Sequence, residues 1–125
     1  MTASTTDVIG HYQAAVTANP DSVDAQCNLG WGYYGQRQYA EAIETFRAAL
    51  RLDQGSVDAN YGLGLSLKEA GQHDEAVPVF VKVMQLAPQK ETGTRGRMLA
   101  RLARGHVNQM KKGDWDLDDE VRHEL

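Results

Sequence analysis

The chain has 125 residues, of which 42% are hydrophobic and 24% charged, and its formal net charge is −4. These values are typical of one globular domain, and the acidic balance excludes a globally basic nucleic-acid binder. The single cysteine, Cys27, excludes a scaffold held by internal disulfides. No apolar run approaches the roughly 18 residues that span a bilayer, and the first residues carry no signal-peptide pattern. We therefore expect one cytoplasmic domain over residues 1–125, without a membrane span.

The first predicted element is a helix over residues 5–18. Val8, Ile9, Tyr12 and Val16 recur there at the spacing of one helix face. We expect this face to pack on the next helix of the chain. The opposite flank is a candidate seam for a homodimer.

Two copies of one pattern follow, offset by 34 residues. The clearest match is Ser22-Val-Asp-Ala25, which recurs as Ser56-Val-Asp-Ala59. A fixed period of this length is typical of repeat architectures. The predicted repeats cover residues 22–55 and 56–89, and the helix before them has the pattern of a half-repeat.

Each repeat is predicted to contain two antiparallel helices. Ser22 and Ser56 stand where a helix N-cap belongs, and Gly71 suits a left-handed C-cap. The second helix of the first repeat is expected over residues 39–52, and we expect Ala87-Pro88 to end that of the second repeat. Because connections of about three residues join the helices, consecutive helices must be antiparallel neighbours. No segment alternates with period two, so we expect no strand.

The repeated residues carry a resemblance to a known family. They are Asn28-Leu29-Gly30, Tyr33, Ala42, Phe46 and Leu50 in the first copy, and Leu63-Gly64, Gly71, Ala76, Phe80 and Pro88 in the second. The pattern resembles the tetratricopeptide repeat over residues 6–90, with Arg37 in place of the usual turn glycine. The resemblance implies an all-α fold, a right-handed α-solenoid of antiparallel helix pairs with about six helices. It also implies that small residues let neighbouring helices approach closely around Phe46 and Phe80.

Beyond residue 89 the repeat pattern fails, but a helical period persists. We expect residues 90–112 to form one long capping helix, because the end of a repeat array needs a helix that covers its apolar surface. The predicted apolar stripe of this helix is Met98, Leu99, Leu102, Ala103, Val107 and Met110. Its predicted basic patch is Arg95, Arg97, Arg101, Arg104, Lys111 and Lys112. Residues 113–125 form an acidic tail with apolar side chains embedded in it.

Charge is segregated between these last two segments. Residues 90–112 hold 7 Lys and Arg against 1 Asp or Glu, whereas residues 113–125 hold 1 against 6. A basic helix could bind nucleic acid, an anionic surface or an acidic partner. Alternatively, the acidic tail lies near the helix and masks it. No aromatic residue interleaves the arginines, as a base-stacking surface would need, so we do not expect a nucleic-acid partner.

No catalytic or metal-binding constellation stands out in the sequence. The four histidines are scattered, and none lies three or four residues from another, as a helical metal pair would. Asp114, Asp116 and Asp118 alternate, but they lack the glycine and closing glutamate of a calcium loop. Cys27 has no histidine partner in the pattern. We therefore expect no enzyme activity, no cofactor and no metal.

The remaining candidate site is a groove lined by the first helices of the two repeats. Its predicted residues occupy the outward flank of those helices: Cys27, Asn28, Trp31, Tyr34, Tyr61, Leu65 and Lys68. Large aromatic residues at outward positions indicate binding. Trp31 is the expected anchor, outside the repeat core. Alternatively, the capping helix or the tail covers these side chains.

The expected function is a protein–protein interaction module, a scaffold or adaptor that binds a peptide or helix in this groove. A homo-oligomerisation module is an alternative. Some chaperone co-factors of the family grip an acidic C-terminal carboxylate with lysine, asparagine and arginine. The matching positions here are Cys27, Trp31, Gly62, Thr92 and Gly96. None has the required side chain, so the resemblance favours a more apolar ligand.

Overall fold

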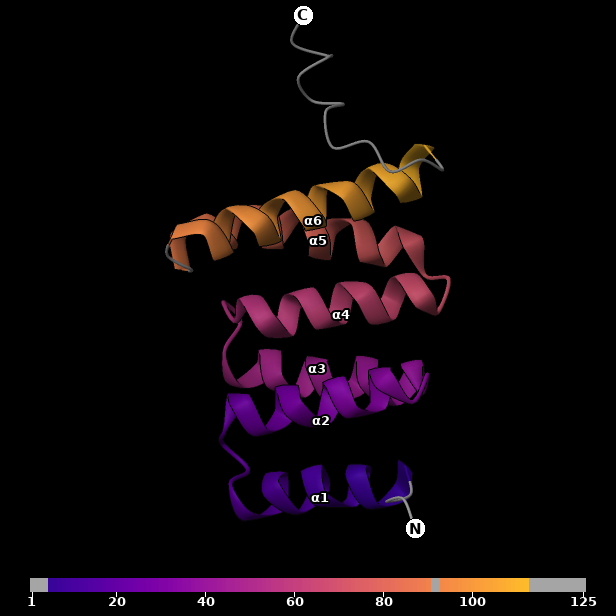
Figure 1. Ribbon diagram of the computed structural model, residues 1–125, viewed down its shortest axis with the longest axis vertical. Coiled ribbons are helices and arrows are strands. Elements are labelled where there is room, and N and C mark those ends of the chain that lie inside the picture. Colours follow the sequence, from indigo (N-terminus) through magenta and orange to yellow (C-terminus); the bar gives the residue numbers. More distant parts are fainter. Residues whose placement is uncertain (1–4, 91–92, 113–125) are drawn as a thin grey trace, which may run out of the picture.

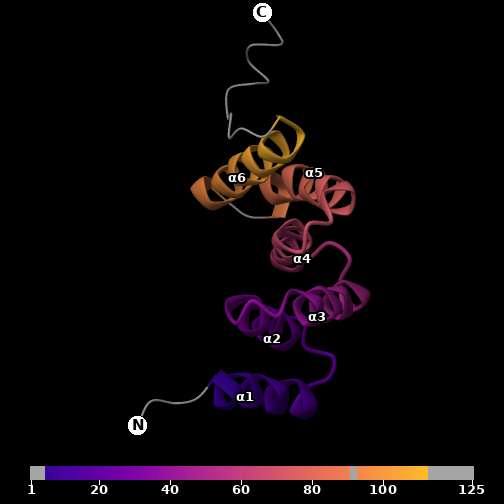
Figure 2. The ribbon, with the colours of Figure 1, turned by 90° about the vertical axis from the view of Figure 1, so that its right-hand side faces the viewer.

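The computed structural model describes residues 5–90 and 93–112 as a stack of α-helices with no strand. The helices are α1 (Thr5–Ala18), α2 (Val23–Gly35), α3 (Tyr39–Leu52), α4 (Val57–Glu69), α5 (His73–Lys90) and α6 (Gly93–Lys112). Figure 1 shows them layered in chain order, with α1 and α6 at opposite ends. In the turned view of Figure 2, α2 and α6 lie towards one side, and α3 and α5 towards the other. This all-α solenoid confirms the predicted fold class.

The N-termini of α2 and α4 are capped in the same way. The Ser22 hydroxyl accepts a hydrogen bond from the Ala25 N–H at 3.1 Å, and the Ser56 hydroxyl accepts one from the Ala59 N–H at 3.1 Å. Each bond satisfies a backbone donor that the helix itself leaves open. The two predicted N-caps are therefore confirmed.

The turns between paired helices also share one geometry. Gly71 has φ +81°, which confirms the predicted left-handed C-cap. Arg37, at the equivalent place in the first pair, has φ 61°. In both turns the next N–H reaches back five residues, Gln38 to Tyr33 O and Gln72 to Leu67 O, each at 2.9 Å. The turn geometry thus imposes the left-handed backbone even where the sequence has no glycine.

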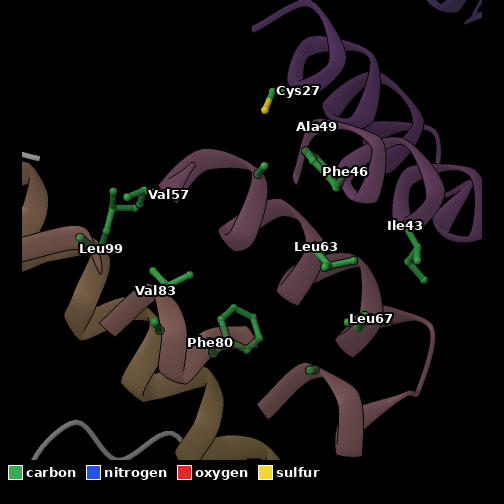
Figure 3. Close-up of a cluster of buried hydrophobic side chains, with 14 of the residues drawn as sticks. Cys27, Ile43, Phe46, Ala49, Val57, Leu63, Leu67, Phe80, Val83 and Leu99 are labelled. Carbon is green, nitrogen blue, oxygen red and sulfur yellow. The ribbon is translucent and has the colours of Figure 1, made fainter. Parts of the chain in front are cut away.

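The core is built from aromatic rings set against glycines. Phe46 and Phe80 are both 0% exposed. A Cβ atom at Gly30 would lie 2.8 Å from the Phe46 ring, and one at Gly64 would lie 2.9 Å from the Phe80 ring. Such distances leave no room for a side chain, so the glycines let α2 approach α3 and let α4 approach α5. The core cluster includes residues of α2 to α6, and Figure 3 shows several of them, from Cys27 of α2 to Leu99 of α6.

Helix α1 packs on α2 as predicted. A Cβ atom at Gly32 would lie 2.9 Å from the Tyr12 ring and 3.2 Å from the Ile9 side chain. Ile9 is 8% exposed, but Val8 is 39% exposed and does not join the packed face. Val8 lies about 100° around the helix from Ile9, and among the described helices α1 has a neighbour on one side only.

The predicted end of α5 is wrong. The helix continues through Pro88 to Lys90, and it also contains Pro78. Proline has a φ compatible with the helix, and it removes one backbone hydrogen bond without ending the segment here. Ala87 is completely buried, and α5 makes its most extensive packing with α6, which holds this last turn in place.

Helix α6 begins at Gly93, later than the predicted residue 90, which belongs to α5; residues 91–92 lie outside the described segments. Part of its predicted apolar stripe packs on the core: Leu99, Ala103 and Val107 are buried. Leu102 and Met110 are half-buried. Met98 is 49% exposed, so its assignment to the packed stripe is wrong. Met98 lies on the side of α6 that faces away from Ala103.

Candidate partner-binding face on α2 and α4

Six of the seven predicted groove residues reach the surface of α2 and α4, which we call the α2–α4 face. Asn28 is exposed. The other five are half-buried: Trp31, Tyr34, Tyr61, Leu65 and Lys68. Helices α2 and α4 also contact each other directly, so residues of both helices form one continuous surface.

Cys27 does not lie on this face, which corrects the sequence prediction. It is 2% exposed and belongs to the core. Burial, together with the nearby carboxylate of Asp58, raises the pKa of the Cys27 thiol to about 12. The side chain lies near Ser56 at the start of α4 because the two helices contact each other there. A thiol in this state is a small packing group and no nucleophile.

Trp31 is half-buried, so its ring both packs on the core and reaches the α2–α4 face. Its ring packs edge-on against Phe46, with centroids 5.0 Å apart, and against Tyr34 at 5.8 Å. Its indole N–H donates to the carboxylate of Asp58, with N–O distances of 3.2 and 3.3 Å. The prediction that Trp31 stands outside the repeat core is therefore wrong, because the residue cross-links α2, α3 and α4.

Tyr34 extends the aromatic surface. The centroid of its ring lies 5.6 Å from that of Tyr39 at the start of α3. Trp31, Tyr34 and Tyr39 therefore form a continuous row of three rings. Burial and the nearby charge of Glu69 raise the pKa of the Tyr34 hydroxyl. We call Trp31, Tyr34 and Tyr39 the aromatic row.

The α4 half of the face is covered in part by α6. The Tyr61 hydroxyl lies 3.3 Å from His106 Nε2, and Lys68 Nζ lies 2.9 Å from His106 Nδ1. Lys68 also donates to the side-chain oxygen of Gln109. Self-cover by the capping helix therefore holds for Tyr61 and Lys68, whereas the rings of Trp31 and Tyr34 pack against aromatic residues of α2 and α3.

The imidazole of His106 is neutral in this arrangement. Burial, and then the charge of Lys68, lower its pKa to about 4. Because an ammonium group can only donate, Nδ1 accepts from Lys68 and the proton sits on Nε2, which donates to Tyr61. The same ring stacks on Phe80, with centroids 4.8 Å apart. The network ties α4, α5 and α6 together.

Most of the predicted basic patch is exposed on α6. Arg95, Arg97, Arg101 and Lys111 are exposed, and Arg104 is half-buried. The side chain of Lys112 lies outside the described part of the structure. Two of these arginines, Arg97 and Arg101, border a pocket of about 390 Å³. Its lining residues are Thr94, Arg97, Met98, Arg101 and Leu102.

Sequence reasoning left Asp58 out of the predicted groove residues and did not place His106 or Gln109 at the site. Asp58 repeats Asp24 at the 34-residue offset, a signal that could have drawn attention to it. His106 and Gln109 have no counterpart in the repeats, so no pattern could place them against Lys68. In the described ranges, no group of three or more His, Cys, Asp and Glu side chains could hold a metal. Over the same ranges, no helix is both long and apolar enough to traverse a bilayer.

The comparisons with known proteins agree with this architecture. The family model described as the tetratricopeptide repeat matches residues 27–91, more than half of the chain. This match runs from residue 27, within α2, to the end of α5 and so includes the aromatic row and all but the first turn of the two helix pairs. No curated protein is significantly similar to the chain. The helix pairs, their glycine–phenylalanine packing and this match together show that the chain belongs to the tetratricopeptide repeat family.

Proposed function

We propose that the chain is a non-enzymatic scaffold or adaptor that binds a peptide or helix of a partner protein on its α2–α4 face. Tetratricopeptide repeats generally mediate protein–protein interaction. The observation that carries the proposal is the aromatic row, which presents partly exposed rings on α2 and at the start of α3, while the equivalent part of α4 is engaged with α6. Aromatic side chains of this kind often dominate the energy of an interface.

The charges around the aromatic row favour a particular ligand. Asp58 is exposed and accepts a hydrogen bond from the Trp31 indole, and the charge of the exposed Glu69 raises the pKa of the Tyr34 hydroxyl, so both carboxylates lie near the α2–α4 face. The ammonium group of Lys68 is held by His106 and Gln109. The preferred peptide therefore carries apolar anchors with lysine or arginine between them, which can pair with the carboxylates and stack on the rings.

A screen of synthetic peptides against the full chain tests this proposal. Peptides that bind should combine apolar and basic residues, and Tyr34→Ala should weaken their binding by about 2 kcal/mol, the size of an interface hot spot. Tyr33→Ala is the matched control, because Tyr33 is also half-buried on α2 but its hydroxyl accepts a hydrogen bond from Gln13 of α1. The proposal fails if both variants bind the selected peptides equally.

A further inference from the structure

The outer side of α6 carries an apolar slot between two arginines. Met98 and Leu102 lie in the pocket of about 390 Å³, with Arg97 and Arg101 beside them. Met98 is more exposed than any other large hydrophobic side chain among the described residues. Figure 1 shows α6 at the end of the stack, so no described helix lies beyond α6.

The segment that follows α6 has the complementary chemistry. Residues 113–125 hold 6 acidic residues against 1 basic residue. Leu117, Val121 and Leu125 recur at every fourth position, which would place them on one side of a helix. An acidic segment with one apolar stripe matches a slot that combines two apolar side chains with two arginines.

The segment is also long enough to reach the slot. From the end of α6 back to Leu102 is ten residues, or about 15 Å along the helix axis, and back to Met98 it is fourteen residues, or about 21 Å. Thirteen residues span about 18 Å as a helix, and roughly 40 Å if extended. Because the segment is joined directly to α6, its effective concentration at the slot is on the order of millimolar.

We propose that residues 113–125 dock on the outer side of α6 of their own chain, with apolar side chains on Met98 and Leu102 and carboxylates on Arg97 and Arg101. In this position, the carboxylates of the docked segment neutralise part of the basic patch of the same chain. None of the residues of the slot belongs to the α2–α4 face, so this inference stands independently of the proposed function.

The fluorescence of Trp115 in the full chain reports the docking. Trp31→Phe leaves Trp115 as the one indole, because the chain has two tryptophans. In that background, Arg97→Glu with Arg101→Glu should shift the Trp115 emission to longer wavelength and increase its quenching by acrylamide. The matched control is Arg51→Glu with Lys82→Glu, an equal charge change at exposed positions of α3 and α5, which should change neither signal.

A second variant keeps the test decisive if the α6 substitutions unfold the chain. Leu117→Ser with Val121→Ser leaves the sequence of α1–α6 intact, and it should release Trp115 in the same way. A Trp115 that is fully exposed before any substitution, as it would be if a separate partner occupies the slot, overturns the proposal. So does a signal that depends on protein concentration together with the mass of a dimer, because a second copy would then be the occupant.

Discussion

The two helix pairs have the same interior and different surroundings. Phe46 and Phe80 occupy equivalent positions, are both fully buried, and lie against Gly30 and Gly64. On its far side, Phe46 meets Gly62 of the next helix in the stack, whereas Phe80 stacks on His106 of α6. In the first pair the far side of the buried phenylalanine is covered by a glycine of the next helix. In the last pair it is covered by the His106 ring of the capping helix.

This difference extends to the α2–α4 face. Trp31 and Leu65 are equivalent, as are Tyr34 and Lys68. The first pair of helices presents an aromatic row, while in the second pair Lys68 is tied to His106. The capping helix therefore takes over part of the α4 surface and leaves α2 to carry the candidate site.

The largest expected effect tests the shared interior. Phe46→Ala and Phe80→Ala should each lower the free energy of unfolding by about 3–5 kcal/mol, because each leaves a cavity that the surrounding helices cannot fill. Urea unfolding of the full chain measures both. A loss below about 1 kcal/mol at Phe80 would mean that α6 moves in to replace the ring, and that the two interiors are not equivalent.

The second largest expected loss of stability distinguishes Trp31 from Leu65, its equivalent position in the second repeat. Trp31→Ala should lower the free energy of unfolding by about 2 kcal/mol, because it removes the packing on Phe46 and the hydrogen bond to Asp58. Leu65→Ala should cost less, since Leu65 offers a smaller half-buried side chain. Equal losses at the two positions would contradict a special role of Trp31 in joining α2 to α4.

These two expectations show how far sequence reasoning reaches. The caps at Ser22 and Ser56 follow from local chemistry, so the sequence was sufficient for them. The burial of Cys27 depends on the contact between α2 and α4, and the continuation of α5 through Pro88 depends on packing against α6. The 34-residue pattern does not predict tertiary contacts of this kind. His106 also has no equivalent residue in the repeats, so the pattern could not predict its hydrogen bonds.

The third effect concerns the pH dependence that only the second pair should have. The pKa of His106 is lowered from 6.5 to about 4, so the unfolded chain binds this proton more tightly than the folded chain does. Its contribution to stability is complete above pH 6.5 and should be lost as the pH falls towards about 4. His106→Phe should remove this part of the pH dependence of the urea midpoint. His73→Gln, at an exposed position of α5, is the control and should leave it unchanged.

The smallest expected effect comes from a substitution that gives both turns the same residue at the left-handed position. Arg37→Gly should raise the free energy of unfolding by about 1 kcal/mol, because φ 61° is strained for any side chain and unstrained for glycine. Gly71→Ala should lower it by a similar amount. A destabilised Arg37→Gly variant would show that the arginine side chain makes a contact that outweighs the backbone strain.

The most direct test of the account is to observe where a bound peptide touches the chain. Titrating a selected basic–apolar peptide into the ¹⁵N-labelled full chain should shift the indole N–H resonance of Trp31 and the backbone resonances of Tyr34, because the aromatic row is the proposed binding surface. The resonances of Met98 and Leu102 on the outer side of α6 should stay in place. Shifts confined to α6, with Trp31 and Tyr34 unchanged, would contradict the assignment of the partner site to the α2–α4 face.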